Sequence, residues 1–213
     1  RNIASGGSEM LITPDVVVSL RRITRQCCER IARTAFELAM TRNKHVTMVH
    51  KANVLKLGDG MFLEMCRQVA AEFPEVRVDD VIVDAMMAHV VRAPQRYDVI
   101  VTTNMFGDIL SDLTAELSGS LGLGGSLNAG RDYAMGQAAH GSAPDIAGQN
   151  IANPISLILS GAMLLNWHGQ KTGQANFLQA AAAIEATIAD TILAHECTRD
   201  VGGKPVSYTH LRA

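Results

Sequence analysis

The stretch Tyr97-Asp-Val-Ile-Val-Thr-Thr-Asn-Met-Phe-Gly-Asp-Ile-Leu-Ser-Asp112 passes from a β-branched segment directly into a helical one. Residues 97–102 predict a strand, and the apolar spacing from Phe106 to Leu117 predicts a helix. The same alternation occurs upstream, with strands expected over 46–49 and 78–83 and helices over 24–40, 60–73 and 86–91. Strands that alternate with helices are typical of an α/β fold.

The composition is that of an ordinary globular protein. Of the 213 residues, 47% are apolar and 19% are charged, and the net charge is −2. This balance gives no reason to expect a nucleic-acid or membrane partner. The longest apolar run, Ile155 to Trp167, is broken by polar residues and is too short to span a bilayer. Four cysteines with neither zinc-site nor disulfide-framework spacing favour a reducing, cytoplasmic location.

The chain changes character near its middle. From Gly119 to Gly130 it is rich in Gly, Leu and Ser, and we expect a domain boundary there, between residues 1–119 and 120–205. Helices are predicted after Asn153-Pro154 and over 180–193. In the first half, the helix over 24–40 is expected to carry an apolar stripe, which consists of Ile23, Cys27, Ile31, Ala35 and Leu38.

Two carboxylates, Asp108 and Asp112, lie four residues apart on the helix predicted after Asn104. That spacing places both on one face, and the apolar residues around them predict a largely buried helix. A hard divalent cation such as Mg²⁺ or Mn²⁺ would relieve the repulsion between the two charges. Asp84, expected at a strand end, is a candidate third ligand. The alternative is that these residues only cap the helix or face solvent.

Two further segments carry candidate site residues. Lys51 follows the strand over 46–49, where a lysine beside carboxylates can act as a general base; the alternative is a surface lysine. The second segment has the composition of a tight loop whose backbone could approach a ligand, and Asp145 could accept hydrogen bonds from ribose hydroxyls. The loop residues are His140, Gly141, Ser142, Ala143, Pro144 and Asp145.

Taken together, these motifs resemble the isocitrate/isopropylmalate dehydrogenase family of decarboxylating 2-hydroxyacid dehydrogenases. The resemblance covers most of the chain, from Thr13 to about Gly203, and rests on several motifs in the family's order. They are His50-Lys-Ala-Asn53, Val83-Asp84, Asn104-x-Phe-Gly-Asp-Ile-Leu-Ser-Asp112 and His140-Gly-Ser-Ala-Pro-Asp-Ile-Ala-Gly-Gln-Asn-Ile-Ala-Asn-Pro154. The resemblance implies an isopropylmalate dehydrogenase-like two-domain fold, here incomplete, with mixed sheets flanked by helices.

The resemblance also implies roles for the candidate residues. Asp84, Asp108 and Asp112 would hold Mg²⁺ or Mn²⁺, and Lys51 would help to remove the substrate's hydroxyl proton. Lys51 and Asp84 would serve the active site of a neighbouring subunit, which implies a homodimer with shared active sites.

The resemblance places the adenosine part of NAD on the loop from His140 to Asp145, together with Asn153. Asp145 and Ile146 are similar to the family's NAD-type pattern, since an NADP-type member would carry a basic residue and a tyrosine there. The implied reaction is NAD-dependent oxidation of a malate-type 2-hydroxyacid followed by loss of CO₂. The substrate would be 3-isopropylmalate, isocitrate or homoisocitrate, and a tartrate- or malate-type dehydrogenase is the alternative.

The sequence departs from the family pattern at both ends. A tyrosine expected to protonate the enol is absent, and Ser5 lies in the aligned stretch. We therefore expect a partial chain without its N-terminal part, inactive by itself, and a non-native tail over 206–213. An inactive fragment and a non-catalytic regulatory subunit are the alternatives to an active enzyme.

Overall fold

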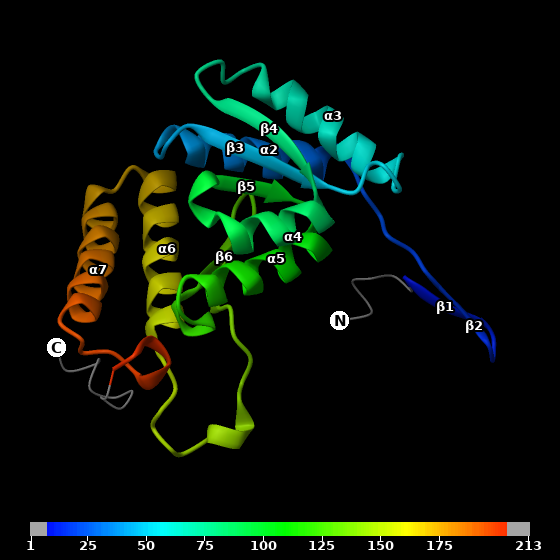
Figure 1. Cartoon of the computed structure of the whole chain (residues 1–213). Coiled ribbons are helices and arrows are strands. Elements are labelled where there is room, and N and C mark those ends of the chain that lie inside the picture. Colours follow the sequence, from blue (N-terminus) through cyan, green and yellow to red (C-terminus); the bar gives the residue numbers. More distant parts are fainter. Residues whose placement is uncertain (1–7, 204–213) are drawn as a thin grey trace. The chain divides into compact units, whose positions relative to one another are not determined.

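The computed structural model describes residues 8–203 (Figure 1). Internal contacts divide the chain into two compact units, residues 1–110 and 111–213, so the division falls inside helix α5 (Asn104–Leu117). The boundary expected between residues 119 and 120 remains a prediction. The tail expected over 206–213, like Ser5, lies outside the described residues.

A three-stranded parallel sheet, in the order β4-β3-β5, forms the centre of the first unit. The predicted strands are confirmed as β3 (His45–His50), β4 (Arg77–Ile82) and β5 (Val99–Thr102). All six residues of β3 are buried, as expected for the central strand of a sheet that is covered on both faces. Because the strands are parallel, the polar residues that follow them meet at one edge.

Helices α2 (Arg25–Met40) and α3 (Gly58–Ala70) pack against each other and share the main core with the sheet. Thr24 caps α2, since its hydroxyl accepts the backbone N–H of Cys27 at 3.3 Å. Phe36 of α2 stacks on Phe73, with the ring centroids 5.5 Å apart. Helix α4 (Val83–Arg92) follows β4 directly and buries Met86 and Val90.

The apolar stripe expected on α2 is only partly confirmed, since Ala35 is buried and Ile23 packs against the core. The helix buries a neighbouring face that consists of Cys28, Ala32, Ala35, Phe36 and Ala39. Ile31 and Leu38 are 47% and 49% exposed, and Cys27 is also exposed. Small residues at the buried positions let the helix approach its neighbours closely, and Phe36 fills the remaining space. The apolar periodicity predicts the helix correctly. It does not tell which of two adjacent apolar faces packs against the core.

A two-stranded antiparallel hairpin precedes this unit's core. Strands β1 (Glu9–Thr13) and β2 (Val16–Ser19) flank a turn at Pro14-Asp15, and neither strand was predicted. All nine of their residues are exposed, although most are apolar. A lone two-stranded hairpin is marginal in water. A ribbon with this much exposed apolar surface is therefore typical of a contact surface.

The second unit pairs a hairpin with two long helices. Strands β6 (Gly125–Ala129) and β7 (Ala134–Ala138) form an antiparallel sheet, and α6 (Ile155–Thr172) and α7 (Ala175–Leu193) follow. Both helices were predicted, although α7 begins five residues earlier than expected. The two strands were missed because glycine, serine, asparagine and alanine dominate them. The short helical turns are η1 (Pro94–Arg96), η2 (Leu121–Leu123), η3 (Pro144–Ile146) and η4 (Arg199–Val201).

Buried serines join α6 to this hairpin. The Ser160 hydroxyl accepts the N–H of Ser126 at 3.0 Å and lies 2.7 Å from the carbonyl oxygen of Gln137. The Ser156 hydroxyl accepts the N–H of Ala139 at 3.1 Å. A β-carbon at Gly136 would lie 2.7 Å from the Ser160 carbonyl oxygen, so only glycine allows this approach. The serines that interrupt the apolar run are thus the residues that bind α6 to the hairpin.

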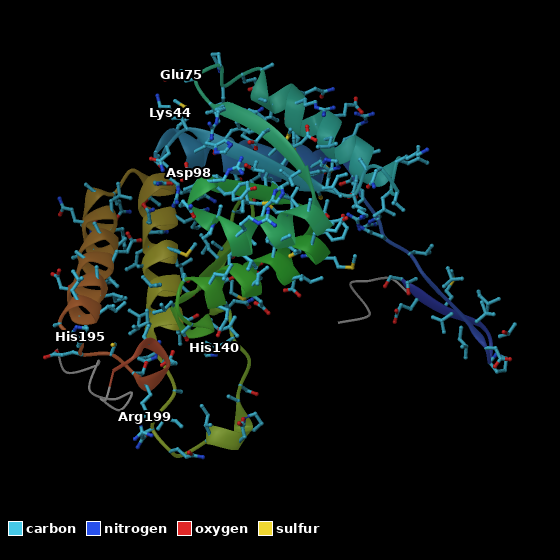
Figure 2. The ribbon with its side chains drawn as sticks, viewed as in Figure 1. Lys44, Glu75, Asp98, His140, His195 and Arg199 are labelled. Atoms are coloured by element: carbon cyan, nitrogen blue, oxygen red, sulfur yellow. The ribbon has the colours of Figure 1, made fainter. Side chains whose placement is uncertain are left out.

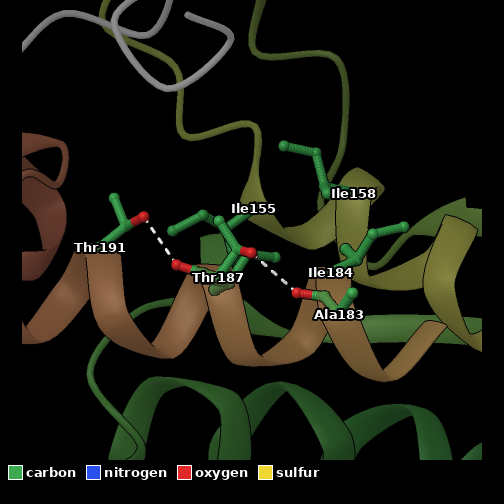
Figure 3. A pocket seen from close by; sticks show the side chains of 7 residues that line it. Ile155, Ile158, Ala183, Ile184, Thr187 and Thr191 are labelled. Carbon is green, nitrogen blue, oxygen red and sulfur yellow. Dashed lines mark hydrogen bonds between the residues drawn. The ribbon is translucent and has the colours of Figure 1, made fainter. Parts of the chain in front are cut away.

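A groove of about 280 Å³ runs between α6 and α7 (Figure 3). The hydroxyls of Thr187 and Thr191 lie in it, and each donates to the carbonyl four residues earlier, at 2.8 and 2.7 Å. Their hydrogen-bonding capacity is therefore used within α7. Among residues 8–203, no helix is both long and apolar enough to cross a membrane.

Candidate active site

Lys51 and Asp84 form an ion pair at the carboxyl edge of the parallel sheet. Lys51 follows β3 directly, and its Nζ lies 2.5 Å from Oδ1 of Asp84. Asp84 belongs to the first turn of α4, so the expectation that it ends a strand is slightly wrong, because β4 stops at Ile82. The hydrogen bond from Lys51 lowers the pKa of Asp84, with the helix's first-turn backbone contributing in the same direction.

Asp108 and Asp112 lie on α5 at the predicted spacing, and both are exposed. The expectation of a largely buried helix is wrong, since α5 buries only Leu110 and leaves Met105 and Ile109 53% and 56% exposed. The repulsion between the two carboxylates is therefore screened by water. It does not by itself require a cation.

The three acidic residues do not form a complete metal site within one chain. Across residues 8–203, no group of three or more His, Cys, Asp or Glu side chains could hold a metal ion. Carboxylate oxygens are nevertheless the ligands that Mg²⁺ and Mn²⁺ prefer. The donor chemistry of Asp84, Asp108 and Asp112 fits such an ion, although the three side chains do not form such a group among the described residues.

A hollow of about 810 Å³ lies beside the segment that follows β7. His140, Gly141, Ser142 and Ala143 line it, together with Asn153. Ala143 has a φ of +40°, the left-handed conformation that turns the loop into η3. The predicted loop residues are thus gathered around one space, and its volume lies in the range of small-molecule sites. The lining residues from the expected loop do not include Pro144 and Asp145.

The far wall of the hollow is formed by η4. Arg199 and Asp200 line it, and His140 and Arg199 are both labelled in Figure 2. Asp200 accepts hydrogen bonds from the Ser120 hydroxyl at 2.5 Å and from Nδ2 of Asn153 at 2.9 Å. Burial by itself would raise the pKa of Asp200, but these hydrogen bonds outweigh it and hold the pKa below its usual value.

Asn153 is buried, and both its side-chain oxygen and its amide nitrogen are hydrogen-bonded. Its Oδ1 accepts the N–H of Ile155 at the start of α6, while its amide donates to Asp200. A β-carbon at Gly122 would lie 2.7 Å from that of Asn153 and 2.9 Å from an oxygen of Asp200. Gly122 is therefore required where three segments of the unit converge. Asn153 thus helps to shape the wall of the hollow.

Sequence reasoning missed several residues of these two sites. Asp200 and Ser120 were not singled out, although Asp200 sits in the family-like run Arg199-Asp-Val-Gly-Gly203. Arg21 and Asp59, which lie beneath Lys51, were also missed. The one available signal was an acidic residue in the glycine-flanked run Gly58-Asp-Gly60, directly before an apolar helix.

Comparison with known proteins gives the class to which this fold and site belong. The family model described as isocitrate/isopropylmalate dehydrogenase matches residues 4–211. The chain is 46% identical over 190 residues to a 3-isopropylmalate dehydrogenase of Archaeoglobus fulgidus, which covers 89% of this chain and 56% of that relative. It is 49% identical over 158 residues to a homoisocitrate dehydrogenase of Methanocaldococcus jannaschii, which covers 74% of this chain and 45% of that relative.

A solved structure agrees. The crystal structure of isocitrate dehydrogenase from Methylococcus capsulatus superposes with a TM-score of 0.87 at 43% identity, covering 97% of this chain and 61% of that one. The chain therefore belongs to the isocitrate/isopropylmalate dehydrogenase family of decarboxylating dehydrogenases, and the resemblance inferred from its motifs is confirmed. It spans about half the length of the curated relatives it matches.

Proposed function

We propose that the full-length protein is an NAD-dependent, Mg²⁺- or Mn²⁺-dependent enzyme that oxidises and decarboxylates a malate-type 2-hydroxyacid. The substrate is 3-isopropylmalate, isocitrate or homoisocitrate. The observation that carries the proposal is the ion pair of Lys51 and Asp84 at the carboxyl edge of the sheet, where α/β folds bind ligands. A lysine and a carboxylate held together there provide a proton acceptor and a metal ligand.

The candidate residues have separate roles in the proposed reaction. Asp84, Asp108 and Asp112 would hold the divalent ion, which when bound would polarise the substrate oxygens and stabilise the enolate left by loss of CO₂. Lys51 would hydrogen-bond the substrate hydroxyl and assist removal of its proton, and the nicotinamide, when bound, would supply the hydride acceptor. Asp84 orients Lys51 through the hydrogen bond that it accepts from the lysine amine.

We assign the hollow between His140 and Asp200 to the adenosine part of the cofactor. Its volume and its backbone-rich lining support this assignment. NAD is proposed over NADP because Asp145 and Ile146 offer neither a basic side chain nor a tyrosine to a 2′-phosphate. The loop bearing Asp145 would have to turn inward for its carboxylate to reach the ribose.

A homodimer with shared active sites is part of the proposal. The incomplete metal shell of one chain supports it, because the missing ligands can come from a second copy. The exposed apolar residues of β1 and β2, and of α5 at Met105 and Ile109, supply surface for such an interface. We also propose a reducing, cytoplasmic location, in keeping with the four free cysteine thiols of the chain.

The test is NADH formation by purified full-length protein with Mn²⁺ and each of 3-isopropylmalate, isocitrate, homoisocitrate, tartrate and malate. We expect turnover with one of the first three, loss of activity with EDTA, and a rate with NADP lower by about tenfold or more. Lys51→Ala should lower kcat by about 10²–10⁴-fold. Turnover of tartrate or malate alone would favour the alternative substrates, and no turnover of any substrate would favour a non-catalytic subunit.

A further inference from the structure

A buried carboxylate lies directly beneath Lys51. Asp59, in the first turn of α3, has 0% exposure. Its Oδ2 accepts the backbone N–H of Lys51 at 2.6 Å, and its Oδ1 lies 2.8 Å from Nη2 of Arg21. Burying a charge is costly unless it is paired and hydrogen-bonded, and here one oxygen faces a cation while the other holds the lysine backbone.

Arg21 extends the contact to α5. Its Nη2 donates to the hydroxyl of Thr103 at 2.7 Å, and its guanidinium lies 5.2 Å from the ring centroid of Phe106. Thr103 precedes α5, and Phe106 lies in its first turn, two residues before Asp108. A continuous chain of contacts therefore joins the backbone of Lys51 to the start of the helix that carries the acidic pair.

A second buried side chain holds the next peptide of the same turn. Nδ1 of His50 accepts the N–H of Ala52 at 3.0 Å, so Nε2 carries the hydrogen and lies 3.1 Å from Oδ2 of Asp80. The N–H groups of both Lys51 and Ala52 are thus bound by buried side chains. The backbone of the lysine has little freedom, and its side chain is directed to Asp84.

We propose that Asp59 and Arg21 are positioning residues for Lys51: they fix its backbone against the start of α5 of the same subunit, so that its amine stays directed to Asp84 and reaches the substrate in the shared site. This inference rests on the proposed function. Neither residue need touch the substrate. The expected effect is large because a displacement of about 1 Å of a reacting group can cost about 100-fold in rate.

The experiment replaces Asp59 by Asn in the full-length enzyme. An amide has one acceptor oxygen, so it can hold the Lys51 N–H or face Arg21, but not both. We expect kcat to fall about 10–100-fold with little change in the KM for NAD. The kinetic isotope effect for substrate deuterated at the hydroxyl-bearing carbon should rise. The matched control is Glu64→Gln, on the same helix, which breaks an exposed 2.8 Å pair with Arg25 and should leave kcat unchanged.

The double variant Arg21→Gln with Asp59→Asn separates positioning from stability. Removing both charges leaves no unpaired buried ion, so Tm should recover relative to either single variant. Under positioning, kcat stays low while Tm recovers; if kcat recovers with Tm, the pair is only structural and the inference fails. If Asp59→Asn does not fold, Arg21→Lys replaces it in the comparison of kcat with Tm. Lysine keeps the positive charge but cannot contact both Thr103 and Phe106.

The failure of this inference differs from the failure of the proposed function. If the wild-type enzyme is active and Asp59→Asn stays within about twofold of Glu64→Gln, the inference is overturned and the function stands. If the wild-type enzyme turns over no substrate, the catalytic role falls with the proposed function. Amide hydrogen exchange across residues 50–55 then tests the positioning itself: faster exchange in Asp59→Asn than in Glu64→Gln supports it, and equal exchange overturns it.

Discussion

Several polar side chains of this chain are buried, and each of those that matter most to the two sites has at least two partners. Asp59 binds Arg21 and the backbone of Lys51, and Asn153 joins the start of α6 to Asp200. A buried polar group that loses one partner leaves the other unsatisfied, so single substitutions at such residues cost more than one hydrogen bond. These residues therefore hold the segments around the two sites in place.

Asp200 allows a prediction at this scale. Its lowered pKa means that the folded state favours the ionised form, so the stabilisation is present above the ordinary carboxyl value and is lost as the pH falls through the lower folded value. Asp200→Asn should therefore lower Tm at pH 7, and the difference from wild type should shrink below about pH 4. Thermal unfolding from pH 3 to 8 measures this. If the difference in Tm between Asp200→Asn and wild type does not depend on pH, the charge of Asp200 does not contribute to stability.

Among the elements, helix α6 is joined to its hairpin by hydrogen bonds of two buried serines. Ser160→Ala would leave the N–H of Ser126 and the carbonyl of Gln137 without this partner. We expect the free energy of unfolding to fall by about 1–3 kcal/mol. Urea denaturation measures it, with Thr172→Ala on the same helix as control, since that exposed hydroxyl donates only to the carbonyl of His168. Equal effects of the two substitutions would contradict the prediction.

The sequence was most informative where one physical constraint dominated an element. The β3 run Val46-Thr-Met-Val49 is buried on both faces, so hydrophobicity alone revealed it. Sequence reasoning could not identify the buried face of α2 or the strands β6 and β7. Both depend on which elements pack against them in the folded chain. Small residues such as Gly136 carry no pattern of their own, and their role emerges only from the close approach of α6.

At the scale of the whole molecule, the proposed shared site makes a quantitative prediction. Lys51→Ala and Asp112→Asn subunits should each be inactive as homodimers. Refolding them together would create heterodimers in which one of the two sites carries both changes and the other carries neither, so about a quarter of wild-type activity should return. Activity of the mixture measures it, with each variant refolded alone as control. A mixture as inactive as its components would place Lys51 and Asp112 in the same site of one chain.

Sequence reasoning was sufficient for the α/β class, for helices α2 to α7, for the three strands of the parallel sheet, for the family, and for the candidate residues Lys51, Asp84, Asp108 and Asp112. Those features rest on local periodicity and on short motifs, which are properties of neighbouring residues. Three features became visible in the folded chain alone: α5 and its acidic pair are exposed, Asp84 lies in the first turn of a helix and contacts Lys51, and Asp59 and Arg21 lie beneath that lysine. Arg21 and Asp59 are far apart in sequence, and their charges meet because α2, which follows Arg21, packs against α3.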